Sequence, residues 1–295
     1  EGFKLGICTN KPGGPLEAVL EAVDLGKWFD VIIVHYSIFI GVDAYLSLHS
    51  KMRIAASRAV KVVFLQDEYR FVQKSIDGIK DIDADIVFTC VPEHSISLVY
   101  NDPDLSRTQF INTLTGYIPD VLPVLPPKEL KKRRYHVSYR GRRYPDWHGE
   151  MGREKFEIAK KFVAATKQSR LRTNISTREK DRVYGNAWVD LIQDSWAVLG
   201  VESGASVFDF SGEISAKTET VRSLLGKDGV VYEDLRKKYF AHAEGKIDLA
   251  QISPRVFEAI SLRTLCILYE GSYSGLLRPD EHYLLLKKDL SNIES

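Results

Sequence analysis

Long apolar runs, an excess of charge and closely spaced cysteines are all missing from this chain. No stretch approaches the roughly 18–20 apolar residues of a transmembrane helix. With 41 basic and 40 acidic side chains the formal net charge is +1, and there is no RNA-binding motif, so we expect no nucleic-acid partner. Cys8, Cys90 and Cys266 are odd in number and scattered through apolar runs, which is typical of a reduced, cytoplasmic protein.

Several catalytic motifs are missing as well. The first predicted strand, Phe3–Thr9, is followed by Asn10–Pro15 without the Gly-x-Gly-x-x-Gly of nucleotide-dependent oxidoreductases. The chain has no Gly-x-Ser-x-Gly elbow and no Walker loop, which argues against a serine hydrolase and a P-loop kinase. No cysteine–histidine spacing indicates zinc. Asp81–Asp85 contains an Asp-x-Asp pattern, but it precedes a strand, so we interpret it as a polar turn and expect no metal ion.

The chain instead shows a regular alternation of short apolar runs and helical patterns. Apolar runs such as VIIVH, bounded by polar residues, are typical of strands buried on both faces of a parallel sheet. Strands that alternate with helical segments indicate βαβ units. The predicted strands are Phe3–Thr9, Val31–His35, Lys61–Leu65, Ile86–Cys90, Thr108–Leu114, Tyr135–Tyr139, Leu171–Ile175, Trp196–Gly200, Thr264–Tyr269 and His282–Leu286. The predicted helices are Leu16–Val23, Tyr45–Val60, Phe71–Ile79, Lys155–Thr166, Thr218–Leu225, Tyr232–Tyr239 and the segment after Ser253.

The composition of the chain changes near residue 120. Prolines at 119, 123, 126 and 127 interrupt any regular element, and Lys128–Arg134 is charged. This predicts a linker at 121–134 between an N-terminal domain, 1–120, and a C-terminal domain, 135–295. The predicted fold class is α/β, with two Rossmann-like domains facing each other across a cleft, which is a favoured place for ligand sites.

The segment Ser253–Gly275, SPRVFEAISLRTLCILYEGSYSG, is the most informative part of the sequence. Ser253 is a good helix N-cap, and Pro254 suits the first helical position because its missing N–H would have no partner there. The strand Thr264–Tyr269 then ends in a loop of glycines and serines. Ligands bind beyond the carboxyl ends of the strands in open α/β sheets, and such a loop lets the backbone approach an anion closely.

These residues resemble the C-terminal part of a bacterial glycosyltransferase with the two-domain GT-B fold. The families in question are the spore-maturation-type (CgeB-like) and group 1 glycosyltransferases. The resemblance rests on SPRVFEA, TLCILYEGSYSG and LLRPDEHYLLLKKDLSNIE, about the last fifty residues, and is looser before them. It implies that Glu258 holds the ribose of a nucleotide-sugar donor, and that Gly271, Ser272, Tyr273 and Ser274 hold the donor diphosphate.

Further donor contacts are expected in the basic stretch Lys131–Lys160, which holds ten Lys and Arg against four Asp and Glu. RGRR follows a predicted strand there, and arginine suits bidentate phosphate contacts. The resemblance implies that Arg140 or Arg142, with Lys155 opening the next helix, binds the donor phosphates. The alternative is a solvated basic loop.

Four more residues complete the predicted donor site. Arg255 lies three residues before Glu258 on the same helix, and the alternative for the two is a surface pair. Glu202, Ser203 and Gly204 follow the strand Trp196–Gly200 and either lie beside the nucleotide or cap the next element.

Catalytic candidates come from the N-terminal half. Asp67 and Glu68 follow one predicted strand and His35 follows another, so each lies at the expected ligand edge of a parallel sheet. A carboxylate or histidine there could act as the general base that deprotonates an acceptor hydroxyl. The alternatives are solvated loop carboxylates and a core histidine with satisfied hydrogen bonds.

We therefore expect a glycosyltransferase that moves a sugar from a nucleotide-sugar to a glycan or lipid-linked acceptor in cell-surface polysaccharide assembly. No cofactor or metal is implied. The alternative is a non-catalytic nucleotide-sugar or glycan-binding module, because many retaining members have a second Glu where this chain has Ala250. We expect a cytoplasmic location, with association at the inner membrane face left open. The first residue is Glu1 and the last, Ser295, falls within a predicted domain, so a fragment of a longer protein is expected.

Overall fold

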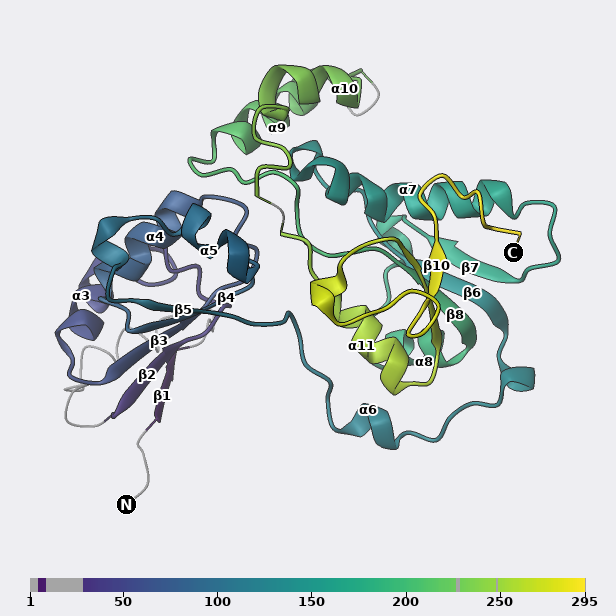
Figure 1. The fold of residues 1–295 in the computed structure, drawn as a ribbon, viewed down its shortest axis with the longest axis horizontal. Coiled ribbons are helices and arrows are strands. Elements are labelled where there is room, and N and C mark those ends of the chain that lie inside the picture. Colours follow the sequence, from purple (N-terminus) through teal and green to yellow (C-terminus); the bar gives the residue numbers. More distant parts are fainter. Residues whose placement is uncertain (1–4, 9–28, 227–228, 248, 295) are drawn as a thin grey trace. The chain divides into compact units, whose positions relative to one another are not determined.

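The computed structural model describes residues 5–8, 29–226, 229–247 and 249–294. In these ranges the chain forms two α/β units, each built on a five-stranded parallel sheet (Figure 1). The predicted fold class is confirmed at this level, and both sheets are compatible with Rossmann-like domains. Every predicted strand is present, with each end within two residues of the prediction.

The sheet of the first unit has its strands in chain order. Strands β1 (Leu5–Cys8), β2 (Val31–Val34), β3 (Val60–Phe64), β4 (Ile86–Thr89) and β5 (Gln109–Asn112) pair in parallel as β1-β2-β3-β4-β5. Right-handed connections that always step in the same direction place their helices on one face of a sheet. Figure 1 shows this for α3 (Leu48–Ala56), α4 (Val72–Asp81) and α5 (Glu93–Val99). The predicted helix Leu16–Val23 lies outside the described residues.

Two glycines let helix α4 approach the turn after β2 closely. A Cβ on Gly78 would lie 2.6 Å from the carbonyl oxygen of Ile40, and one on Gly41 would lie 2.4 Å from that of Lys74. Both contacts are with backbone atoms, which cannot swing aside as the end of a side chain can.

We expect Gly78→Ala to lower the free energy of unfolding by about 1–3 kcal/mol, because the added methyl group overpacks this contact. Helix propensity alone predicts the opposite result, a more stable protein, because alanine stabilises a helix relative to glycine by about 1 kcal/mol. Urea titration of the full chain measures the change, with Asp77→Ala as control. Asp77 is an exposed neighbour on α4, and its replacement should stay within about 0.5 kcal/mol of wild type. A Gly78→Ala protein more stable than wild type would contradict the prediction.

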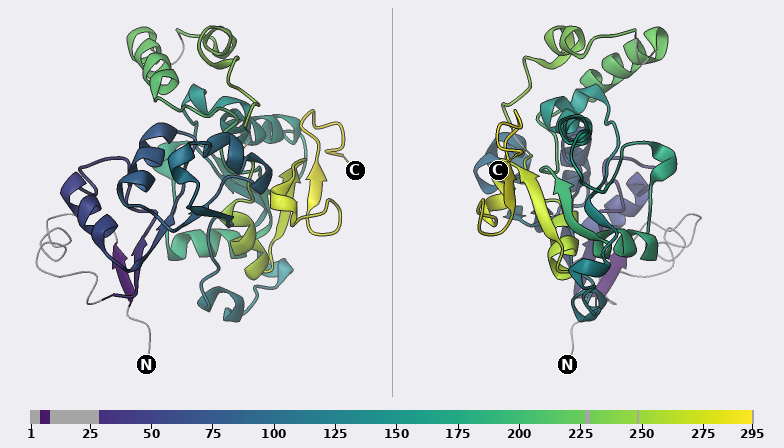
Figure 2. Two further views of the ribbon diagram at one scale, coloured as in Figure 1. Left: turned by 60° about the vertical axis from the view of Figure 1, so that its left-hand side comes forward. Right: turned by 90° about the vertical axis from the view of Figure 1, so that its right-hand side faces the viewer.

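The sheet of the second unit reverses its order. Its strands are β6 (Tyr135–Arg140), β7 (Thr173–Ser176), β8 (Ser195–Gly200), β9 (Leu265–Tyr269) and β10 (Leu284–Leu286), arranged β10-β9-β8-β6-β7 and all parallel. Figure 2 shows β9 and β10 side by side in yellow. The chain steps from β6 outward to β7, then returns past β6 to β8. The reversal requires helices on both faces of the sheet.

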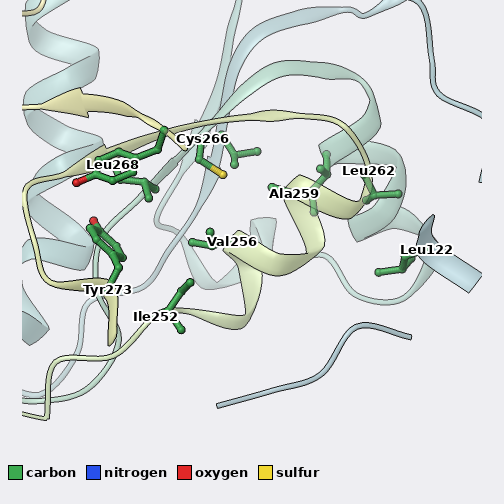
Figure 3. Packing of buried hydrophobic residues seen from close by; sticks show 11 residues of the cluster. Leu122, Ile252, Val256, Ala259, Leu262, Cys266, Leu268 and Tyr273 are labelled. Atoms are coloured by element: carbon green, nitrogen blue, oxygen red, sulfur yellow. The ribbon is translucent and has the colours of Figure 1, made fainter. Parts of the chain in front are cut away.

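Two hydrophobic cores cover the two faces of this sheet. Helix α7 (Gly149–Ala165) packs on one face, and α8 (Asn186–Gln193) and α11 (Pro254–Ser261) on the other (Figure 1). Successive strand residues alternate between them: Val198 and Leu268 face α11, whereas Leu199 and Tyr269 face α7. Figure 3 shows the core around α11. This burial on both faces explains why the strands read as continuous apolar runs.

The predicted domain boundary differs from the division in the structure. The second unit begins at Leu114 and includes the predicted linker, because Leu122 of α6 (Val121–Val124) is buried in the α11 core and Trp196 donates to the Leu130 carbonyl. Residues Val207–Val231 and Lys237–Leu249, which carry α9 (Glu213–Leu225), group with the first unit. α10 (Tyr232–Leu235) groups with the second unit.

The reason for this division is a set of contacts that no local pattern reveals. Asp209 donates its backbone N–H to the Tyr69 carbonyl, and Gln73 donates to the Phe210 carbonyl. In the second unit the hydroxyl of Thr115 donates to the carbonyl of Ile252, so the segment before α6 is attached there.

Candidate functional site

A pocket of about 450 Å³ opens where the strand order of the second sheet reverses. The chain leaves β6 toward α7 and the neighbouring strand β8 toward α11, on opposite faces of the sheet, which leaves a crevice at the carboxyl ends of these two strands. The pocket is lined by the ends of β6 and β8, by residues 182–185 before α8, and by the first turns of α11. Its volume lies in the range of small-molecule sites. Ligands of open α/β sheets bind where the strand order reverses. In the described strands of the first sheet the order does not reverse, so we expect the ligand site in the second unit.

The pocket is strongly cationic. The charged groups among its described lining residues are one carboxylate, Glu258, and five cations: Arg140, Arg142, Lys155, Arg182 and Arg255. Four aromatic residues also line it: Tyr139, Tyr144, Tyr184 and Trp188. An excess of arginine and lysine over carboxylates, with aromatic surface beside it, suits a phosphorylated ligand with a flat ring system.

Glycine is required at the end of β6. A Cβ on Gly141 would lie 2.6 Å from the Tyr139 ring and 2.9 Å from the carbonyl of Lys155. The hydroxyl of Tyr139 donates to that same carbonyl at 2.7 Å, which ties β6 to α7. Burial raises the pKa of Tyr139, and the nearby Arg255 charge opposes the rise. The pocket floor is therefore fixed by close packing of β6 against α7.

The structure distinguishes the two arginines that the sequence left as alternatives. Arg140 donates to the carbonyls of Asp181, Tyr139 and Asn174 and to the Asn174 side chain, all at 2.8–2.9 Å. Burial lowers the pKa of Arg140. Arg142 is exposed, and its guanidinium lies 4.6 Å from the centre of the Tyr144 ring. Arg140 thus fixes the pocket wall, whereas Arg142 is the arginine that can reach a ligand.

Lys155 occupies a different place on its helix from the predicted one. α7 begins at Gly149, so Lys155 lies in its second turn and not at its N-terminus. Its ammonium group is 4.3 Å from the centre of the Tyr144 ring and 3.3 Å from the carbonyl of Gly204. Arg142 and Lys155 therefore lie beside the same aromatic ring, and their positive charges favour an anion in this part of the pocket.

Glu258 and Arg255 lie on the same helix but are not paired with each other. Glu258 Oε2 accepts a hydrogen bond from Trp188 Nε1 at 2.8 Å. Arg255 donates to the carbonyl of Arg140, and its guanidinium lies 5.4 Å from the Trp188 ring and 5.6 Å from the Tyr139 ring. In the described part of the chain Glu258 Oε1 has no hydrogen-bond partner. The surface pair considered from the sequence is thus replaced by contacts that keep both groups at the pocket.

The glycine- and serine-rich loop after β9 is held by a carboxylate of the protein itself. Glu202 Oε1 accepts from the backbone N–H of Tyr273 at 2.6 Å and from the Ser272 hydroxyl at 3.1 Å. A Cβ on Gly271 would lie 2.6 Å from the same carboxylate. Because Glu202 already fills the anion position at Tyr273 N–H, that N–H is not available to a donor diphosphate.

The remaining loop residues also have structural contacts. The Tyr273 side chain is buried and donates to the carbonyl of Tyr269, and burial raises its pKa. Ser274 Oγ accepts from the N–H of Ile252. None of Gly271–Ser274 is among the pocket's described lining residues, and Glu202 and Gly204 are not among them either, whereas Ser203 is. Glu202 thus occupies the Ser272 hydroxyl and the Tyr273 N–H, and the cations of the pocket lie at β6 and α7; diphosphate binding by the loop stays a prediction.

In the first unit Glu68 is buried and not accessible to a substrate. Its side chain accepts hydrogen bonds from Thr89, from Tyr100 and from the N–H of Cys90. Burial raises its pKa, the three hydrogen bonds oppose the rise, and Asp67 adds to it. The prediction that Glu68 faces an acceptor is contradicted, because donors at the ends of β4 and α5 enclose its carboxyl group.

Asp67 and His35 remain closer to solvent. Asp67 is exposed, has a positive φ of 57°, and accepts from the Tyr69 hydroxyl at 3.2 Å. His35 is half-buried and its Nδ1 lies 2.9 Å from the Ser37 hydroxyl. Their roles as general bases stay predictions. The Asp81–Asp85 segment is confirmed as a polar turn, since its three carboxylates each pair with a different cation.

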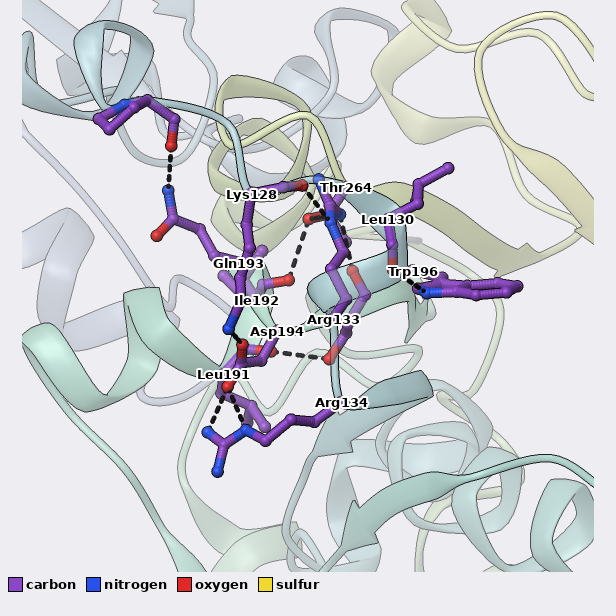
Figure 4. Close-up of polar contacts among 12 residues, drawn as sticks. Lys128, Leu130, Arg133, Arg134, Leu191, Ile192, Gln193, Asp194, Trp196 and Thr264 are labelled. Atoms are coloured by element: carbon purple, nitrogen blue, oxygen red, sulfur yellow. Dashed lines mark hydrogen bonds and ion pairs between the residues drawn. The ribbon is translucent and has the colours of Figure 1, made fainter.

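Part of the basic stretch serves the fold at the opposite edge of the second sheet (Figure 4). Arg133 is buried before β6, and Arg134 and Lys128 pair with the carboxylate of Asp194. Burial raises the pKa of Asp194, but the hydrogen bonds from Lys128 and Arg134 outweigh it and lower the pKa overall. These cations stabilise the amino ends of the strands and are not part of the pocket.

Sequence reasoning missed Trp188, Tyr144, Tyr184 and Arg182. Helix α8, which carries Trp188, was not predicted: its eight residues, NAWVDLIQ, are few and have no side-chain N-cap. Of these residues, Tyr144 was the one with a sequence signal: it directly follows the basic run in GRRY, residues 141–144.

Among the described residues, no group of three or more histidine, cysteine, aspartate or glutamate side chains is placed to hold a metal ion. No helix in the described ranges has the length and apolar character needed to cross a membrane. No protein-family model matches this chain, and no curated protein is significantly similar to it.

Proposed function

We propose that this protein is a glycosyltransferase of the GT-B type that binds its nucleotide-sugar donor in the pocket of the second unit. The observation that carries the proposal is the cationic pocket at the reversal of the strand order, with one carboxylate and several aromatic side chains. The sequence resemblance of Ser253–Gly275 supports it independently of the pocket.

We place the donor diphosphate beside Arg142 and Lys155. Both cations lie against the Tyr144 ring in the pocket lining. When the bond from sugar to diphosphate breaks, negative charge builds up on the leaving diphosphate. Cations already fixed at that place stabilise this charge without reorganising.

The ribose is placed at Glu258. Its Oε1 is not engaged by the described residues, and an ionised carboxylate oxygen is a strong acceptor for a sugar hydroxyl. Trp188, Tyr144 and Tyr184 offer aromatic faces to a base. Arg255, held at the Arg140 carbonyl, adds positive charge beside the same hydroxyls and phosphates.

A nucleotide-sugar-binding module without turnover is the second candidate. The observation that favours it is the burial of Glu68, which leaves Asp67 and His35 as the predicted bases. In a GT-B enzyme the first unit would present the acceptor, a glycan or a lipid-linked sugar. Turnover of a donor with such an acceptor distinguishes the enzyme from the module.

We expect a nucleotide that binds wild type to bind Arg142→Ala about 10–100-fold more weakly, since hydrogen bonds to charged groups contribute about 1.5–3 kcal/mol. Thermal stabilisation with UDP-, GDP-, dTDP- and CMP-sugars and free nucleotides identifies the ligand class, and calorimetry then gives the affinity. Glu258→Ala should also weaken binding.

The matched control is Arg143→Ala. Arg143 is adjacent in sequence but lies within 3.8 Å of Asp146 and outside the pocket lining, so its replacement should leave affinity within about threefold. Equal losses in the Arg142 and Arg143 variants would indicate a general charge effect and contradict the proposed diphosphate position. No stabilisation by any nucleotide would contradict the proposed function.

A further inference from the structure

We infer that Trp188 is a positioning residue that holds Glu258 ready for a ligand, and that it thereby gives the pocket its preference for ribonucleotides over 2′-deoxyribonucleotides. The inference rests on the proposed function, in which Glu258 receives the ribose. Trp188 lies on α8 and Glu258 on α11, and the hydrogen bond between Nε1 and Oε2 at 2.8 Å links the two helices across the pocket wall.

The hydrogen bond from Trp188 takes the place of an ion pair between Glu258 and Arg255. Arg255 is one helical turn earlier, and side chains three apart on a helix are neighbours that readily form an ion pair. In this part of the described chain no ion pair joins Arg255 to Glu258. The indole N–H takes one carboxylate oxygen, while the Arg140 carbonyl takes the guanidinium.

The indole ring also supports Arg255. The guanidinium carbon lies 5.4 Å from the centre of the Trp188 ring, so the N–H edge of Trp188 contacts the glutamate and its face contacts the arginine. One side chain therefore fixes two opposite charges at separate places. If the N–H is removed while the ring is kept, the carboxylate is expected to turn toward Arg255.

Fixing Glu258 in advance lowers the free-energy cost of binding a ligand hydroxyl. A glutamate that is already fixed does not lose rotamer freedom when a hydroxyl binds, whereas a free or arginine-paired one must first be reoriented. With Oε2 engaged, Oε1 is the oxygen left for a ribose hydroxyl. We assign this position to the 2′-hydroxyl, so a ligand without it does not gain the hydrogen bond and should not depend on Trp188.

Calorimetric titration with UDP, dUDP, GDP and dGDP tests the inference. Wild type is expected to prefer the ribonucleotide of the class that it binds by about 10–100-fold, the range for a hydrogen bond to a charged acceptor. Trp188→Phe keeps the ring and loses the N–H, so the preference should fall to about threefold or less through loss of ribonucleotide affinity alone. Glu258→Gln, which removes the charged acceptor, should reduce the preference as well.

Trp196→Phe is the matched control. Trp196 lies in the same unit, donates its indole N–H to the Leu130 carbonyl and does not line the pocket, so both affinities should remain at the wild-type level. An unchanged ribonucleotide preference in Trp188→Phe overturns the inference. An equal loss of both nucleotides in a folded Trp188→Phe protein also overturns it, because that pattern indicates a purely structural role.

A second measurement needs neither the Trp188→Phe variant nor any ligand. In protein labelled with ¹⁵N-tryptophan, Glu258→Gln should move one indole N–H resonance, because it replaces a charged acceptor with a neutral one. No change in any indole resonance overturns the inference even if Trp188→Phe does not fold. If wild type binds no nucleotide, the proposed function fails, and the indole resonance still shows whether Trp188 holds Glu258.

Discussion

Replacing Glu68 by alanine is expected to lower the free energy of unfolding by about 3–5 kcal/mol. The side chain is 3% exposed, and its loss would leave the hydroxyls of Thr89 and Tyr100 and the N–H of Cys90 without their acceptor. Each buried donor left unsatisfied costs about 1–3 kcal/mol, and a cavity adds to this. Urea titration of the full chain followed by circular dichroism measures the loss.

The pH dependence of the same group has a definite sign. The folded pKa of Glu68 is raised above its ordinary value of 4.5, chiefly by burial, with Asp67 adding to the rise. Its protonated form therefore stabilises the fold fully below pH 4.5, and this stability is lost as pH rises from there through the folded pKa.

Glu68→Gln keeps the shape and removes the titration. The stability of wild type relative to Glu68→Gln should therefore decrease as pH rises above 4.5, by at most about 1.4 kcal/mol per pH unit. Glu93→Gln serves as control, because Glu93 is an exposed carboxylate in the same unit. A difference that does not vary with pH, or one that increases, would contradict the assignment of Glu68 as a buried group with a raised pKa.

We expect a second large effect from Arg133→Ala, a loss of about 3–5 kcal/mol. Arg133 is 4% exposed and donates to the carbonyls of Lys128, Ser195 and Arg263 and to the Thr264 hydroxyl at 2.8–3.1 Å. These partners precede or begin β6, β8 and β9, so one guanidinium ties three strand starts together. Burial lowers its pKa, and Asp194 opposes this.

The control for this effect is Lys132→Ala, next along the chain. Lys132 is exposed and pairs with Glu129, an ion pair of the kind that contributes about 0–1 kcal/mol. Arg133→Lys should be intermediate, because an ammonium group has three donors and no planar fork. Three of the four tryptophans, Trp147, Trp188 and Trp196, belong to this unit, so tryptophan fluorescence in urea reports mainly on it. An Arg133→Ala protein within about 1 kcal/mol of wild type would contradict the role.

The sequence predicted the strands well because their signal is local. A strand buried on both faces must be apolar at every position, and runs such as VIIV and LCILY show this without reference to any other part of the chain. Helices were less well predicted. α7 begins at Gly149 instead of Lys155, and the short α8 has no cap or long periodic stripe that would mark it.

Candidate site residues were harder to predict, because the sequence does not show which partner a charged side chain contacts. Arg133 and Arg142 belong to one basic stretch, yet they lie at opposite ends of β6, whose six residues span about 20 Å. One ties the strand starts together and the other lines the pocket. Glu258 was identified by resemblance, whereas the loop that follows β9 proved to be held by Glu202.

By itself, the sequence determined the α/β class, the positions of the ten strands and the presence of arginine, lysine and glutamate at strand and helix ends in the C-terminal half. Only the tertiary structure decided which of these side chains meet. The order β10-β9-β8-β6-β7 brings Arg142, Trp188 and Glu258 to one pocket although more than a hundred residues separate the first from the last. Apolar runs of this kind fit many strand orders, and the partners of each polar group are set only when the sheet assembles.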